Sequence, residues 1–316
     1  MPSVRLVGAR RIVASQRTRN PLARLLSRGS PAEMFRKKTP SPTPPAAVAP
    51  PAPEQAPHSG ILDQYVRTLP SEQNALDLFA GSWSSALPSV LGLAAGPLPI
   101  FDDDRIKKVL AHFDNNITGF KVLELGPLEG GHTYMLHEAG AEVTAIEGSS
   151  KAYLKCLVVK EILHMNRASL HLGDFTPYLE QTDDTFDLVL ASGVLYHTLD
   201  PVGLLELVAK VTDKVAIWTH YWEENAVRSD EKISRVFLDD PLDQQWRGRT
   251  IRLHPRHYRE ALGWSGFCGG PETSARWMER DGLMTVLTEL GLHNITVLEE
   301  ETDHLNGPAI LLVAQR

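Results

Sequence analysis

The sequence predicts an α/β fold with a doubly wound, mostly parallel sheet. From residue 120 onward, short apolar runs that are typical of buried strands alternate with segments of helical pattern. Strands separated by helices favour parallel pairing with right-handed crossovers. Two further apolar runs near the C-terminus flank a loop containing Asn306-Gly307-Pro308, so we expect them to pair antiparallel.

The expected elements follow in a regular order. The expected strands are 120–126, 142–147, 169–172, 186–191, 215–221, 295–299 and 309–314. The expected helices are 74–79, 105–113, 131–139, 150–165, 201–211 and 274–290. Three acids at 102–104 precede the second helix, Ser149 or Ser150 caps the fourth, and Pro201 begins the fifth. After Tyr221 the alternation stops for about fifty residues.

Composition divides the 316 residues into four parts. Residues 1–38 carry ten Arg or Lys and one acid, so we expect a disordered basic tail. Residues 39–60 are expected to form a linker, because eight Pro and five Ala occur within 39–57. We expect an N-terminal helical extension at 61–119. The main domain is expected at 120–316, with an insertion at about 222–275.

Charge and cysteine content limit the classes of function. The net charge is −7, but residues 1–58 carry +8 and the remainder −15. This net negative charge outside residues 1–58 argues against a general nucleic-acid binder. The two cysteines, Cys156 and Cys268, indicate free thiols in a reducing cytoplasm; an Arg-rich transit peptide at 1–38 is the organellar alternative. No apolar run approaches the roughly twenty residues of a membrane span.

A glycine turn follows the first expected strand. Glycines at 126, 130 and 131 would let the main chain approach a ligand closely, although any tight strand-to-helix turn also needs glycine. The spacing is not the dinucleotide pattern G-x-G-x-x-G. Glu147 ends the second strand, where a carboxylate can accept both hydroxyls of a ribose. Together these residues predict an adenosine-containing cofactor.

Two later strand ends supply further candidate residues. Asp174 can accept a hydrogen bond from an exocyclic amine and Phe175 can stack on a purine, while capping of a helix is the alternative role for Asp174. Ligands of open parallel sheets bind beyond the carboxyl ends of the strands. Ser192 and Gly193 are therefore expected next to the first-strand loop.

These motifs together resemble class I S-adenosylmethionine-dependent methyltransferases. The resemblance rests on Leu123-Glu124-Leu125-Gly126, Ala145-Ile146-Glu147, Gly173-Asp174-Phe175, Phe186-Asp187-Leu188-Val189 and Gly193-Val194-Leu195-Tyr196-His197. The last run is similar to the subgroup that contains the tRNA wobble-uridine carboxymethyl-transferring enzyme. The resemblance covers roughly residues 120–221.

The resemblance implies a Rossmann-like sheet with strand order 3-2-1-4-5-7-6 and an antiparallel C-terminal strand. It implies S-adenosylmethionine as the cofactor, with Glu124 and Gly126 at its methionine and sugar side and Ser192 at its methionine end. Glu147 would hold the ribose and Asp174 the adenine amine. With the residues noted above, the expected cofactor-binding set is Glu124, Gly126, Gly130, Glu147, Asp174, Phe175, Ser192 and Gly193. The family usually has another glycine within the run that here reads Pro127-Leu128-Glu129.

Methyl transfer to oxygen or nitrogen also needs removal of a proton from the acceptor. Candidate catalytic residues are His197 and His220, with Tyr221 as an orienting group. Tyr196 and Trp222 lie in aromatic segments at strand ends, which suits a planar or sugar acceptor. Strand-end packing is the alternative role for these aromatic residues.

The insertion contains a basic run at 246–259 with five Arg and two His. We expect Arg249 and Arg252 to bind an anionic acceptor, with surface pairing to acids at 239–243 as the alternative. No metal site is expected. The leading function is methyl transfer to a small-molecule or glycan-like acceptor. The alternatives are a tRNA uridine-modifying transferase and a non-catalytic cofactor-binding partner subunit; the oligomeric state is not indicated.

Overall fold

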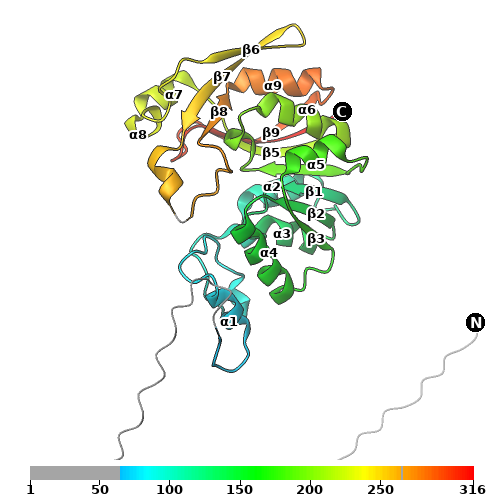
Figure 1. The fold of residues 1–316 in the computed structure, drawn as a ribbon. Helices are drawn as coiled ribbons and strands as arrows, with labels where there is room; N and C mark the ends of the chain where they lie inside the picture. The colour runs from blue at the N-terminus through cyan, green and yellow to red at the C-terminus, as the bar shows by residue number, and fades with distance from the viewer. Residues whose placement is uncertain (1–64, 265) are drawn as a thin grey trace, which may run out of the picture. The chain divides into compact units, whose positions relative to one another are not determined.

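The computed structural model describes residues 65–264 and 266–316. The predicted basic tail at 1–38 and linker at 39–60 lie outside the described residues. The described chain forms a seven-stranded sheet flanked by helices, and a separate three-stranded sheet (Figure 1).

The central sheet has the strand order β3-β2-β1-β4-β5-β10-β9. This confirms the predicted α/β class and order, because the three strands of the insertion only shift the numbering of the last two strands. The first five pair in parallel, and β10 pairs antiparallel with β5 and β9. The bounds are β1 (Lys121–Leu125), β2 (Glu142–Glu147), β3 (Ala168–Leu172), β4 (Leu188–Ser192), β5 (Lys214–His220), β9 (Asn294–Glu301) and β10 (Ala309–Gln315).

Alternating side chains of the strands build two cores on opposite faces of this sheet. In β10, Leu312 enters one core and Leu311 the other. The first core packs against α5, α6 and α9, and the second against α2, α3 and α4 (Figure 1). These helices are α2 (Asp104–His112), α3 (Gly131–Glu138), α4 (Ser150–Ile162), α5 (Phe175–Gln181), α6 (Pro201–Val211) and α9 (Arg280–Glu289).

The segment before α2 packs against the second core. It contains α1 (Glu72–Asp77) and the 3-10 turns η2 (Ser89–Leu91) and η3 (Ile100–Asp102) among irregular chain. A Cβ on Gly131 would lie 2.8 Å from the main-chain oxygen of Ile100, so a glycine there lets η3 approach the start of α3 closely. The extension is thus helical only in part.

The insertion forms its own antiparallel sheet, in the order β6-β7-β8. Its elements are α7 (Glu224–Ser229), α8 (Glu231–Ser234), β6 (Leu242–Trp246), β7 (Arg249–His257), the 3-10 turn η5 (Arg259–Gly263) and β8 (Ser274–Met278). The predicted helix at 274–290 is wrong in its first five residues. Those residues form β8, which buries Ala275 and Trp277 on alternate positions.

No helix within 65–264 and 266–316 combines the length and the apolar character that crossing a membrane requires.

Candidate active site

The glycine turn after β1 alternates through left-handed backbone conformations. The φ angles are +65° at Gly126, +57° at Leu128 and +80° at Gly130. Leu128 stands within the run where the resembled family usually has a glycine, and it takes the conformation that a glycine tolerates best. Its main-chain N–H donates to the Glu147 carboxylate at 2.9 Å, which holds the turn against the end of β2.

Glu147 and Glu124 lie at the carboxyl ends of β2 and β1. The other oxygen of Glu147 accepts from the main-chain N–H of Ser149 at 2.8 Å. Burial raises the pKa of Glu147 despite these hydrogen bonds. Burial also raises the pKa of Glu124 to about 7, against a 2.5 Å hydrogen bond from Thr133 and with a contribution from Glu147. The structure thus brings two predicted cofactor residues together.

Glu129, in the same turn, is a buried acid that was not predicted as a site residue. Its carboxylate pairs with Lys155 of α4 at 2.6 Å and accepts from the main-chain N–H groups of Ser84 and Ser85. Both charged side chains are at most 5% exposed. The turn is therefore tied to α4 and to the N-terminal extension, which gives the unusual Pro127-Leu128-Glu129 run a structural role.

The remaining predicted cofactor residues also lie at strand ends. Asp174 caps α5 by accepting from Thr176 at 2.8 Å, and Phe175 is half-buried beside it. The capping alternative for Asp174 is therefore present. Ser192 has a buried hydroxyl without a hydrogen-bond partner, and Gly193 has a φ of +84°.

An aromatic cluster lies beyond β4 and β5. The ring of Tyr196 is 4.1 Å from that of His197 and 4.7 Å from that of His220. The His220 ring stacks on Trp277 of β8 with centres 5.1 Å apart, and Trp218 contacts Tyr196 and His220 edge-on. The structure therefore brings together three predicted residues and adds Trp277 from the insertion.

The two histidines of this cluster are held in a neutral state. Nδ1 of His220 donates to the carbonyl of Gly307 at 2.9 Å, since a carbonyl only accepts, so Nε2 is the basic nitrogen. Burial lowers the pKa of His220 to about 4. His197 shares a 2.6 Å hydrogen bond with Tyr258, and burial with the nearby charge of Arg256 lowers its pKa to about 3. At neutral pH both imidazoles are therefore uncharged.

Arg256 is the arginine of the basic run that reaches this cluster. Its guanidinium lies 5.1 Å from the ring centre of Tyr258 and 5.7 Å from that of Trp277. Its Nη1 is buried without a hydrogen-bond partner, and burial lowers its pKa. The sequence predicted anion-binding arginines within this basic run. Which of them lies beside the aromatic cluster is determined by the strand pairing of the insertion sheet.

A group of charged residues around the start of α2 also reaches the cluster. Asp103 caps α2 and binds both Arg105, at 3.0 Å, and His132 of α3, at 2.9 Å. Burial opposes ionisation of Asp103, yet hydrogen bonds from His132 and Arg105 hold its pKa well below the usual range. Arg105 in turn lies 4.3 Å from the ring centre of Trp218. Asp103, Arg105 and His132 were not predicted as site residues.

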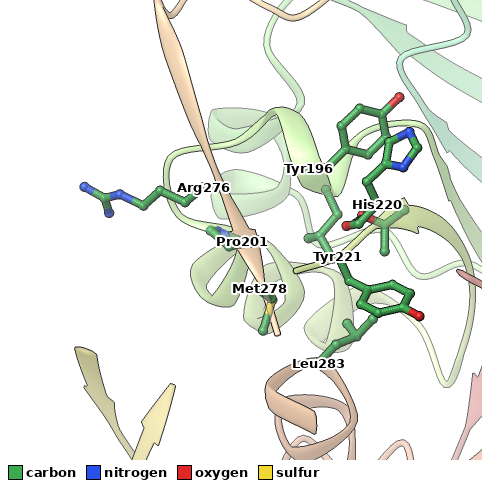
Figure 2. A pocket seen from close by; sticks show the side chains of 9 residues that line it. Tyr196, Pro201, His220, Tyr221, Arg276, Met278 and Leu283 are labelled. Carbon is green, nitrogen blue, oxygen red and sulfur yellow. Dashed lines mark hydrogen bonds between the residues drawn. The ribbon is translucent and has the colours of Figure 1, made fainter. Parts of the chain in front are cut away.

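The structure does not bring Tyr221 together with the histidines. Figure 2 shows Tyr196 and His220 side by side, while the ring of Tyr221 lies apart from them beside Leu283. Successive residues of an extended chain point to opposite faces, so the neighbour of His220 enters the other core. Its hydroxyl donates to Glu300 at 2.8 Å. We therefore correct the orienting role expected of Tyr221.

Three predicted acceptor-binding residues are also placed elsewhere. Trp222 is 4% exposed and stacks on His254 at 3.9 Å inside the insertion. Arg249 pairs with Glu289 at 2.6 Å and Arg252 with Asp243 at 2.8 Å, both on exposed surface. At about 3.4 Å per residue, Arg249 lies roughly 24 Å along β7 from Arg256. The alternative of surface pairing with the acids at 239–243 thus describes Arg252, whereas Arg249 pairs on the surface with a different acid, Glu289.

A family model described as a methyltransferase domain matches residues 123–216, which run from within β1 to the start of β5 and include all the predicted cofactor-binding residues. This match agrees with the predicted methyltransferase class. The predicted cofactor, S-adenosylmethionine, agrees with this match. No curated protein matched the sequence of the chain.

The chain is similar to a solved structure, the N-terminal domain of EvdMO1 in the presence of SAH and D-fucose. The identity is 24% and the TM-score 0.57, over 77% of this chain and 94% of that one. The larger EvdMO1 structure matches with 22% identity and a TM-score of 0.51, over 77% of this chain and 46% of that one. At these identities the likeness shows the shared fold.

Proposed function

We propose that the protein transfers the methyl group of S-adenosylmethionine to a hydroxyl of a small, glycan-like acceptor. The observation that carries this proposal is the aromatic cluster of Tyr196, His197, Trp218, His220 and Trp277, in which both histidines are uncharged. Aromatic rings suit the apolar faces of sugars and planar molecules. The EvdMO1 domain, which has the same fold, was solved with SAH and D-fucose.

The strand-end residues fit the cofactor. Glu147 keeps unused lone pairs for the ribose hydroxyls, and Ser192 has a buried hydroxyl that still lacks a partner. Asp174 uses one carboxylate oxygen to cap α5, which leaves the other oxygen for an amine. Bound S-adenosylmethionine supplies a methyl group that its sulfonium already activates.

His220 is the residue proposed to remove the acceptor proton. Its Nδ1 is committed to the Gly307 carbonyl, and its Nε2 has no hydrogen-bond partner among the described residues. A fixed tautomer with a free basic nitrogen is what a general base requires. His197 is proposed to orient the acceptor, because its Nδ1 already shares a hydrogen bond with the hydroxyl of Tyr258.

The experiment that tests this proposal uses S-adenosylmethionine with a deuterated methyl group. The full-length protein is incubated with a panel of monosaccharides and glycosides, and products are read by mass spectrometry. We expect a labelled methyl on a sugar, with one equivalent of S-adenosylhomocysteine formed. Cofactor binding without a methylated product from any acceptor would favour the alternative of a non-catalytic partner subunit.

The tRNA-modifying alternative is tested separately. A protein that binds nucleic acid through phosphate contacts binds more tightly at low salt. Because the chain outside residues 1–58 carries a net charge of −15, we expect no binding to bulk tRNA at either of two salt concentrations. Salt-dependent binding to tRNA would instead favour the RNA substrate.

A further inference from the structure

The side chain of Arg256 makes no hydrogen bond or ion pair with any residue in 65–264 or 266–316. Its contacts are with the rings of Tyr258 and Trp277, and its Nη1 is buried without a partner. A buried donor on a charged group is costly to leave without an acceptor. The guanidinium is therefore held ready for a group that supplies acceptor atoms.

Other arginines of the insertion sheet differ from Arg256 in this respect. Arg249 and Arg252 each pair with a carboxylate, and Nη1 of Arg276 donates to the carbonyl of Leu199 at 2.8 Å. The guanidinium of Arg256, at the end of β7, thus differs from these three in having no hydrogen-bond acceptor.

That place adjoins both histidines. Tyr258, beneath the guanidinium of Arg256, hydrogen-bonds His197 at 2.6 Å. Trp277, its other ring neighbour, stacks on His220 at 5.1 Å. A molecule that contacts Arg256 would therefore also lie beside the proposed base.

The charge around Tyr196 limits the kind of anion. The two arginines that influence Tyr196 are Arg105 and Arg256, and Asp103 compensates the first. One uncompensated guanidinium remains. Its planar fork matches the two oxygens of a carboxylate, and its single charge balances that of a carboxylate. A phosphate monoester, with nearly two negative charges, would leave charge unbalanced.

We infer that the acceptor carries a carboxylate, and that Arg256 binds it. This inference rests on the proposed function, because it specifies the acceptor of the same site. A carboxylated sugar combines the anion with the apolar ring face that the aromatic cluster suits.

The test is calorimetric titration of the protein saturated with S-adenosylhomocysteine. The probes are D-glucuronate, benzoate and acetate, each compared with its uncharged amide, and inorganic phosphate. We expect the wild type to bind at least one carboxylate about tenfold more tightly than its amide. Arg256→Gln should lose this preference. Arg235→Gln, which removes the same charge from an exposed residue of the insertion, should keep it.

Other results would contradict the inference or the proposed function. No carboxylate preference in the wild type, or the same preference in Arg256→Gln, overturns the inference. Phosphate binding that depends on Arg256 and exceeds carboxylate binding also overturns it. The affinity for S-adenosylhomocysteine, measured on the wild type, Arg256→Gln and Arg235→Gln, shows whether each variant is folded. Failure of the wild type to bind S-adenosylhomocysteine would instead count against the proposed function.

Discussion

The Glu147 carboxylate at the end of β2 accepts a hydrogen bond from the main-chain N–H of Leu128, 2.9 Å away, in the turn after β1. Glu147 thus holds the turn in place through this hydrogen bond. Its remaining lone pairs are available to the ribose hydroxyls at the proposed cofactor site. Leu128 reaches this contact in a left-handed conformation, with φ at +57°.

Leu128 provides a test of backbone strain. A residue with a Cβ pays about 1 kcal/mol in the left-handed region, whereas glycine does not. We expect Leu128→Gly to be about 1 kcal/mol more stable than Leu128→Ala in urea unfolding. This order reverses the one usually found within helices or strands. An alanine variant as stable as the glycine variant would contradict the conformation.

The buried pair of Glu129 and Lys155 should act as a unit. Removing one partner leaves an uncompensated charge, so Glu129→Gln and Lys155→Met should each lower the free energy of unfolding by about 3 kcal/mol. The double variant should lose less than the two single losses combined. Unfolding in urea measures this cycle. Losses that simply add would show that the two side chains do not interact.

Glu124 predicts a pH dependence of stability. Its folded pKa of about 7 lies above the unfolded value of 4.5, so the native state binds more protons between these values. The Glu124 contribution to stability is therefore present below about pH 4.5 and is lost as the pH rises through 7. The loss amounts to about 3 kcal/mol.

The matched variant for this prediction is Glu124→Gln. His197 and His220 act in the opposite direction, because their lowered pKa values make the unfolded state bind more protons between about pH 4 and 6.5. The informative quantity is thus the difference in unfolding free energy between wild type and variant from pH 5 to 8. A difference that does not change with pH would refute the raised pKa.

The base assignment predicts a loss of rate without a loss of cofactor binding. His220→Asn keeps an N–H for the Gly307 carbonyl but removes the basic nitrogen. We expect kcat for S-adenosylhomocysteine formation to fall about 100-fold or more, with cofactor affinity unchanged. The control is Tyr221→Phe, which loses the hydrogen bond to Glu300 and should affect stability rather than kcat. Equal kcat values for His220→Asn and the wild type would remove His220 from the mechanism.

Much of the fold could be predicted because its signals are local. Apolar runs ending at Glu124, Glu147 and Asp174 marked the strands and their order along the chain. The start of the last helix was missed, because neither Gly nor Pro separates β8 from α9 and Trp277-Met278 fits either period. Only pairing with β7 makes Ser274–Met278 a strand.

The site was predicted where its residues stand at strand ends. Glu129 and Arg256 were missed because their surroundings come from distant segments: Ser84 and Lys155 for the first, and Trp277 for the second. Tyr221 and Trp222 were selected for residue type, but the direction of each side chain follows from packing that no local pattern reveals.

The most direct test of the account is calorimetric titration of S-adenosylmethionine into the wild type, Glu147→Ala and Glu142→Ala. Glu142 lies at the exposed, opposite end of the same strand. We predict that the wild type binds and that Glu147→Ala binds at least about tenfold more weakly, or 1.4 kcal/mol. Glu142→Ala should match the wild type. Unchanged affinity in Glu147→Ala would contradict the assignment of the cofactor site.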